Sequence, residues 1–167
     1  MVNFREKMLS FRHLCYKNGY LFAAFLIPVI LMGIAYISFG IYPFGGRSVL
    51  SLDLNAQYVF YFDYVHDVIG NGESLMYSWS RNLSGEFMGI IGYYLASPFN
   101  ILVWIFPRSM ITEGLLTMML AKFGACGVTF ALFAHKSQKL SKTTAALFAP
   151  MYALCAYMIV QTMDYVA

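Results

Sequence analysis

The stretch from Tyr20 to Tyr42 reads YLFAAFLIPVILMGIAYISFGIY and contains no charged residue. A helix rises about 1.5 Å per residue, so this stretch is long enough to cross a hydrocarbon core of about 30 Å. It is too long for the apolar region of a signal peptide, which has about 7–15 residues. The sequence therefore predicts a permanent transmembrane helix at 20–42.

The composition of the whole chain is that of a membrane protein. Of its 167 residues, 60% are hydrophobic and 11% are charged, whereas a soluble domain is about 45–50% apolar and about 25% charged. A globule of this size has too little interior to bury so much apolar surface. Composition therefore excludes a soluble enzyme, a disordered linker and a secreted disulfide scaffold. The three cysteines lie in the N-terminal tail or in apolar runs and do not form a disulfide framework.

Charge alternates in sign along the chain. The tail at 1–19 has four basic residues and one acidic residue, and the loop at 135–142 has three lysines. The stretch 43–87 has five acidic and two basic residues. Because cytoplasmic segments carry an excess of Lys and Arg, we expect the tail and the Lys-rich loop inside and the acidic stretch outside. The tail is expected to lie along the inner leaflet as an amphipathic helix. This alternation does not suit a nucleic-acid-binding protein.

Two further apolar runs complete an expected all-α polytopic bundle. Residues 111–134 and 143–167 are predicted as the second and third transmembrane helices. The run at 88–107 is short and interrupted by Ser97-Pro98, so we expect an interfacial or re-entrant helix within the outer loop 43–110. The chain ends inside an apolar run, which suggests the N-terminal part of a larger protein.

The outer loop is predicted to begin with an amphipathic helix at 53–69, which Gly70-Asn71-Gly72 should end. Its apolar stripe recurs at steps of three and four residues, and consists of Leu54, Tyr58, Tyr61, Val65 and Val68. Tyrosine and tryptophan favour the headgroup zone of a membrane. We therefore expect this helix to lie on the outer membrane surface.

Asp53 opens this helix about ten residues after the first span. A carboxylate at that place is suited to act as a general base on a hydroxyl acceptor. Aspartate is also a common helix N-cap, and position alone favours the capping role about two to one. The two roles are compatible.

Other polar residues of the outer loop carry two interpretations each. Asp63, His66 and Asp67 share a helical face and could bind a divalent ion, but a solvated polar face is favoured about four to one. Arg81 lies in a polar turn, where its guanidinium suits a phosphate. It would equally pair with Glu86 or with lipid headgroups.

The second span contains a lysine near its middle, Lys122. A charge there is costly, so a functional role is favoured over snorkelling or a structural ion pair. Gly124, Gly127 and Ala131 are most simply helix-packing positions. The prior probability that Asp164 is a site residue is low.

No Walker loop, HExxH, CxxC pair or nucleophile elbow is present in the sequence. No cofactor is expected, although dependence on a divalent metal stays open.

Five short blocks stand out in the sequence: DLNAQY at 53–58, YSWS at 77–80, GEFMG at 85–89, YYLASPFN at 93–100 and KFGACG at 122–127. In order and spacing, these blocks resemble the YfhO family of bacterial membrane proteins. The combination of DxxxQY with YYxxSPxN is the specific part of this resemblance. Ser84 departs from the pattern, because glycine is expected there.

The resemblance implies a GT-C-type glycosyltransferase-like fold. Such an enzyme moves a sugar from a polyprenyl-phosphate donor to a cell-envelope polymer, such as lipoteichoic acid, at the outer membrane face. Enzymes of this type carry an essential acidic residue in the first outer loop, which here would be Asp53.

The resemblance also suggests the residues that bind substrate. Gln57 and Tyr58 would position donor or acceptor, with Tyr93 and Tyr94 as further substrate-binding residues. Arg81 and Lys122 would stabilise the departing phosphate.

Two alternatives belong to other functional classes. A transporter or permease subunit would use Lys122 and the broken Ser97-Pro98 segment as a substrate path. A membrane scaffold would carry out no chemistry.

Overall fold

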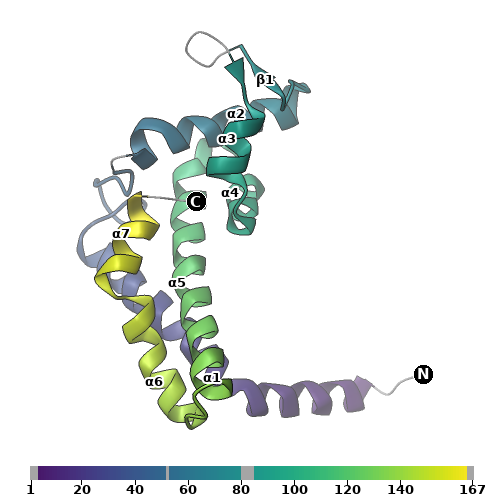
Figure 1. Cartoon of the computed structure of the whole chain (residues 1–167), viewed down its shortest axis with the longest axis vertical. Coiled ribbons are helices and arrows are strands. Elements are labelled where there is room, and N and C mark those ends of the chain that lie inside the picture. Colours follow the sequence, from purple (N-terminus) through teal and green to yellow (C-terminus); the bar gives the residue numbers. More distant parts are fainter. Residues whose placement is uncertain (1–3, 52, 80–84, 165–167) are drawn as a thin grey trace. The chain divides into compact units, whose positions relative to one another are not determined.

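The computed structural model describes the backbone of residues 4–51, 53–79 and 85–164, and the side chains of 18–51, 53–79 and 85–162. The described chain is mostly helical (Figure 1). It divides into two compact units. Unit 1 contains residues 1–32 and 123–155, and unit 2 contains residues 33–122 and 156–167.

Helix α1 runs from Phe4 to Ser38, and its part from Asn18 to Ser38 is long and apolar enough to cross a membrane. The helix ends four residues before the predicted boundary at Tyr42. Gly40 adopts a left-handed conformation with φ 63°, which glycine tolerates without steric cost. Its N–H donates to the Ile37 carbonyl at 3.0 Å, and the next N–H donates to the Tyr36 carbonyl at 2.9 Å. This is the Schellman arrangement that closes a helix.

Helix α5, Ile111–Lys136, contains the predicted second span. Helices α6, Lys142–Ala153, and α7, Ala156–Asp164, lie in the predicted third span and are separated at Leu154-Cys155. Among the described residues, two helices are long and apolar enough to cross a membrane. The number rises to four if each of two bent helix pairs is one span.

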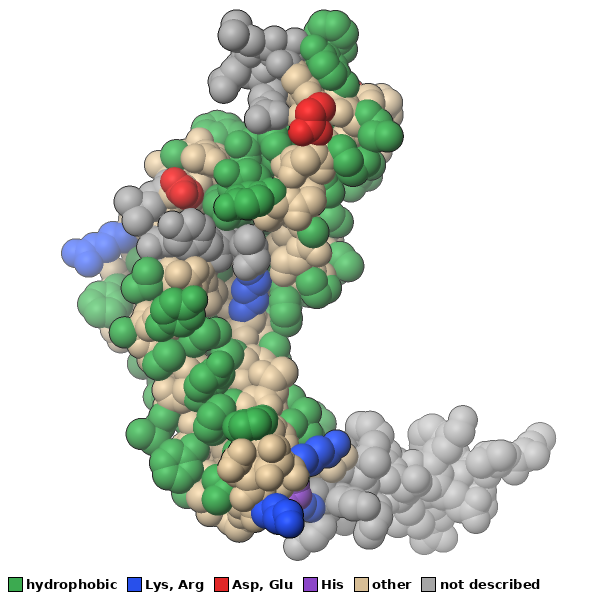
Figure 2. Space-filling view, viewed as in Figure 1, with side chains coloured by type: hydrophobic (Ala, Val, Ile, Leu, Met, Phe, Trp, Pro, Cys, Tyr) green, Lys and Arg blue, Asp and Glu red, His purple; other side chains and the backbone are tan. Residues whose placement is uncertain are grey.

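Unit 1 presents apolar side chains to its surroundings. Along α1, Phe22, Leu26 and Ile30 are each about half exposed. Hydrophobic side chains are also spread over the whole described surface seen in Figure 2, where basic side chains gather beside the turn between α5 and α6. Such a surface suits lipid along the helices and water or headgroups at the Lys-rich turn.

Small residues form the buried centre of unit 1. The cluster joins α1, α5 and α6 and consists of Ala24, Ala131, Ala134, Ala145 and Ala149. A Cβ on Gly127 would lie 2.1 Å from the Ala24 carbonyl oxygen, and one on Gly124 would lie 2.5 Å from the Phe25 ring. Close backbone approach between small residues is the usual basis of helix packing in lipid. Gly124, Gly127 and Ala131 are therefore packing positions, as predicted.

We expect Gly127→Ala to destabilise unit 1 by about 1–3 kcal/mol, because the added methyl group must push α1 and α5 apart. Gly19→Ala is the matched control, since no described atom lies within 4 Å of a Cβ at that position of α1. Both variants gain the same helix propensity. The measurement is denaturant-induced unfolding in mixed micelles, and equal stability of the two variants would contradict the close approach.

In unit 2, the segment between α1 and α5 begins with two joined helices. The π-helical turn η1, Leu54–Tyr58, continues into α2, Val59–Asn71. Gly72 ends α2 with φ 70°, and its N–H donates to the Val68 carbonyl. The predicted helix at 53–69 is thus confirmed, with its stop two residues later. The short strands β1, Tyr77–Ser78, and β2, Gly85–Glu86, then pair in antiparallel register.

The predicted interfacial segment at 88–107 is a broken helix. Helix α3, Met88–Ile90, continues into the π turn η2, Ile91–Leu95, and the 3-10 turn η3, Pro98–Asn100, continues into α4, Ile101–Ile105. The two halves meet at an angle of 96°. Ser97 is extended, as the residue before a proline tends to be. The break therefore lies at the predicted Ser97-Pro98 position.

Candidate functional site

Two π-helical turns of unit 2 carry residues of the most specific sequence blocks. Tyr58 ends η1 and Tyr94 lies in η2. Their rings meet edge to face with centroids 5.0 Å apart. π turns are rare and frequently occur at functional sites, because the extra residue changes where side chains project. The fold thus joins two blocks that lie far apart in the sequence.

A cluster of tyrosines extends from this contact to the surface. The Tyr94 ring lies 5.2 Å from the Tyr61 ring and 4.6 Å from the Tyr93 ring, centroid to centroid. Tyr58 is buried, whereas Tyr93 is 73% exposed. The structure therefore brings together Tyr58, Tyr93 and Tyr94, three of the predicted substrate-binding residues. Burial decreases from Tyr58 to Tyr93, so the Tyr93 end of the cluster is accessible to a ligand.

Asp53 stands immediately before η1 and is partly exposed. Its side chain makes no capping hydrogen bond in the described structure, so the capping interpretation is wrong. The physical reason is the backbone of Asp53, which is helical at φ −64° and ψ −28°. An N-cap normally has an extended backbone that turns its side chain toward the first free amides. Gln57 follows one turn later and is also partly exposed.

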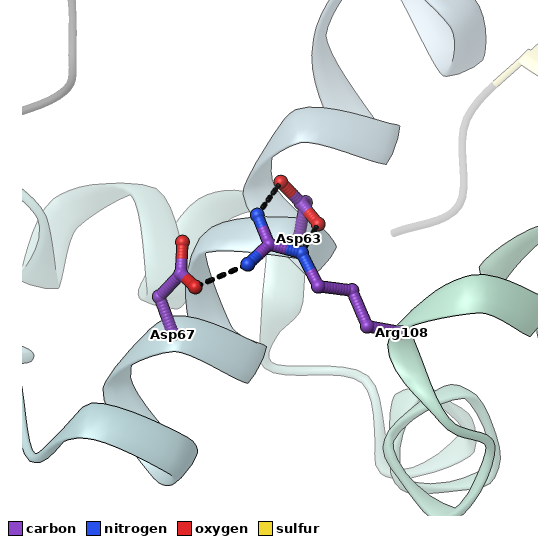
Figure 3. Close-up of polar contacts among 3 residues, drawn as sticks. All are labelled: Asp63, Asp67 and Arg108. Atoms are coloured by element: carbon purple, nitrogen blue, oxygen red, sulfur yellow. Dashed lines mark hydrogen bonds and ion pairs between the residues drawn. The ribbon is translucent and has the colours of Figure 1, made fainter.

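Arg108 binds two carboxylates of α2 (Figure 3). Its Nε and Nη2 donate to the two Asp63 oxygens at 2.5 and 2.6 Å, and its Nη1 donates to Asp67. Within the described residues, no group of three or more His, Cys, Asp or Glu side chains is placed to hold a metal ion. The acidic pair of α2 thus forms a binding place for a guanidinium.

The contact of Arg108 with α2 was not predicted from the sequence. The available signal was the spacing of Asp63 and Asp67, because two carboxylates four residues apart on a helix repel each other unless a cation lies between them. Arg108 precedes the second span directly in the sequence. Nothing in the linear pattern says that α2 folds back onto this point.

Lys122 and Arg81 are the two cationic residues that were predicted to bind substrate. Lys122 is half-buried in α5. Arg81 lies outside the described residues, so the structure does not relate it to Asp53.

The hairpin of β1 and β2 is attached to α2 through Tyr64, which is buried. The Tyr64 hydroxyl lies 3.0 Å from the Ser74 carbonyl and 3.2 Å from the Tyr77 carbonyl, and donates to both. Its ring packs on Phe87 with centroids 4.4 Å apart. Tyr64 lies outside the predicted apolar stripe of this helix, but its ring is part of the core.

We expect Tyr64→Phe to loosen the hairpin at a cost of about 1 kcal/mol, because the hydrogen bonds from the Tyr64 hydroxyl to the Ser74 and Tyr77 carbonyls are lost while ring packing is kept. Hydrogen exchange of the amides at 75–79 measures this loosening. Tyr61→Phe is the control, since the Tyr61 hydroxyl makes no described hydrogen bond. Equal exchange in both variants would show that the hydroxyl does not hold the hairpin.

A second tyrosine links the turn after α1 to the start of α5. The Tyr42 hydroxyl donates to Glu113 Oε1 at 2.9 Å. The hydrogen bond to this carboxylate, with its negative charge, raises the pKa of Tyr42 above the ordinary value of 10.0. Because the folded pKa is raised, the contact is intact at neutral pH and is lost as pH rises through the raised pKa.

We therefore expect Tyr42 to ionise at higher pH in the wild type than in Glu113→Gln, which removes the negative charge. Ultraviolet difference titration of the two proteins measures this shift. Tyr42→Phe identifies the contribution of this ring, and the titration should then no longer respond to Glu113→Gln. Superimposable titrations of wild type and Glu113→Gln would refute the contact.

The family described as "Bacterial membrane protein YfhO" matches residues 23–166 of the chain. The chain matches no curated protein and no solved structure. Since the family match covers most of the chain, the chain belongs to the YfhO family of bacterial membrane proteins.

Proposed function

From this membership, we propose that the protein is a membrane glycosyltransferase acting at the outer membrane face. It would move a sugar from a polyprenyl-phosphate donor to a hydroxyl of a cell-envelope polymer such as lipoteichoic acid. The observation that carries this proposal is the environment of Asp53. Its carboxylate is partly exposed, lies at the start of the proposed outer helix and makes no capping hydrogen bond. A carboxylate not engaged in capping is available to accept a proton.

The proposed reaction is an inverting displacement. Asp53 takes the proton of the acceptor hydroxyl while the acceptor oxygen bonds to the anomeric carbon of the sugar. The bond from that carbon to the phosphate oxygen breaks, and the lipid phosphate leaves with the electron pair. The inverted sugar remains on the acceptor, and the proton remains on Asp53.

Neighbouring side chains support substrate placement. Gln57 lies one helical turn from Asp53, and its amide is suited to orient a hydroxyl. The exposed end of the tyrosine cluster, at Tyr93 and Tyr94, offers rings beside this helix. Arg81 and Lys122 would offset charge on the departing phosphate.

The proposed orientation places the N-terminal tail and the loop 135–142 in the cytoplasm. The acidic segment that carries Asp53 would then face outward. This orientation is supported by the three lysines of the loop, because Lys and Arg favour the cytoplasmic side.

A transporter is the second candidate function. The half-buried Lys122 and the 96° break between α3–η2 and η3–α4 favour it, because broken helices and intramembrane charges often mark transport paths. A transporter would depend on Lys122 and would tolerate Asp53→Asn.

Asp53→Asn tests the proposed chemistry. We expect it to lower sugar transfer by about 10²–10⁴-fold, the usual contribution of a general base. Because Asp53 makes no capping bond, the change in folding stability should stay within about 0.5 kcal/mol. The sugar content of envelope polymers is measured in cells that lack their own copy of the protein, at equal membrane levels of each variant.

Glu73→Gln is the matched control, since Glu73 is an exposed carboxylate of the same segment and should keep full transfer. Lys122→Met is made in parallel. Undiminished sugar with Asp53→Asn would refute the proposed base. If Lys122→Met alone abolished function, the transporter would be the better account.

A further inference from the structure

The Arg108 contact lies between the outer helix and the start of a membrane-spanning helix. Arg108 opens the 3-10 turn η4, Arg108–Met110, which leads directly into α5. Asp63 and Asp67 lie on α2, whose N-terminal extension η1 follows Asp53. All these residues belong to unit 2. The Arg108 guanidinium therefore connects α2, the helix that follows Asp53, to the N-terminus of α5 (Figure 3).

The geometry of this contact is more restrictive than that of a single ion pair. All three guanidinium nitrogens are engaged, two on Asp63 and one on Asp67. A planar fork bound to two carboxylates defines direction as well as distance. The Arg108 side chain is 54% exposed, so water screens the attraction and its contribution to global stability is small. Its effect is to orient α2.

The apolar contacts of the outer helix do not provide the same restriction. Leu54, Phe62 and Val65 are buried, and they hold the helix against its neighbours. Hydrophobic contact is non-directional, however, so a helix held only in this way can slide or tilt by small amounts. A directional contact at Asp63 and Asp67 removes that freedom.

We infer that Arg108 is a positioning residue, which fixes the orientation of α2 and thereby the place of the Asp53 carboxylate relative to α5. This inference rests on the proposed function of Asp53. Ten residues of helix place Asp53 about 15 Å from Asp63. A tilt of α2 by about 5° at the contact of Arg108 with Asp63 and Asp67, hereafter the Arg108 clamp, therefore moves Asp53 by about 1.3 Å. A displacement of about 1 Å at a reacting group can lower a rate about 10²-fold.

The test compares four variants of the complete protein. Arg108→Ala removes the clamp, and Arg108→Lys keeps the charge but loses the fork. The double variant Arg108→Asp/Asp63→Arg restores an ion pair with the charges exchanged. Arg47→Ala is the control, because Arg47 is an exposed arginine of the same unit outside the clamp. Sugar incorporation into envelope polymers is followed over time at equal membrane levels.

We expect Arg108→Ala to lower the rate of incorporation about 10²-fold and Arg108→Lys to lower it less. The charge exchange should recover a large part of the rate, and Arg47→Ala should match wild type. Recovery by exchange is the decisive readout, since a side chain needed only for bulk or solubility would not be restored by moving its charge to another helix.

Hydrogen exchange supplies a readout that does not depend on the reaction. In lipid nanodiscs, Arg108→Ala should speed exchange at 54–71 and leave exchange at 115–122 of α5 unchanged, and the charge exchange should reverse the effect. Unaltered exchange at 54–71 would overturn the inference. So would wild-type incorporation by Arg108→Ala when Asp53→Asn abolishes it. If Asp53→Asn itself kept full incorporation, the proposed function would fail, and the exchange measurement would still decide whether Arg108 holds the helix.

Discussion

The absence of water in the lipid core is the constraint on which the rest of this structure depends. Every backbone N–H and C=O at that depth must find a partner within the protein, and a helix satisfies them within one segment. This explains the uninterrupted course of α1 and α5. It also explains why their packing in unit 1 uses glycine and alanine, because lipid offers no hydrophobic drive between helices and only close contact remains.

The segment between these helices obeys different rules, because its chain changes direction several times. Each change leaves backbone groups that need partners. Asn100 is fully buried at the break between η2 and η3, and its amide donates to the Tyr94 carbonyl at 3.4 Å. Tyr64 does the same for two carbonyls of the hairpin. Polar side chains thus supply hydrogen bonds in this segment where regular backbone hydrogen bonding stops.

The prediction from sequence succeeded where one physical signal dominated. The length of the apolar runs located α1 and α5, the proline at 98 located the break, and glycine located the end of α2. The joining of Tyr58 to Tyr94 could not be read in this way, because it depends on two helices folding together. Asp53 was misjudged as a cap because residue type alone does not define the backbone angles that capping requires.

The sequence by itself determined that this protein lies in a membrane, that it is helical and which family it belongs to. Hydropathy and short motifs suffice for this, because they are properties of consecutive residues. It also located a carboxylate at the start of the helix formed by η1 and α2. Only the tertiary structure decided which side chains meet: Arg108 with the acidic pair of α2, and the tyrosines of two π turns with each other. Those contacts join residues distant in the chain, and their geometry depends on helix orientation, which no local pattern encodes.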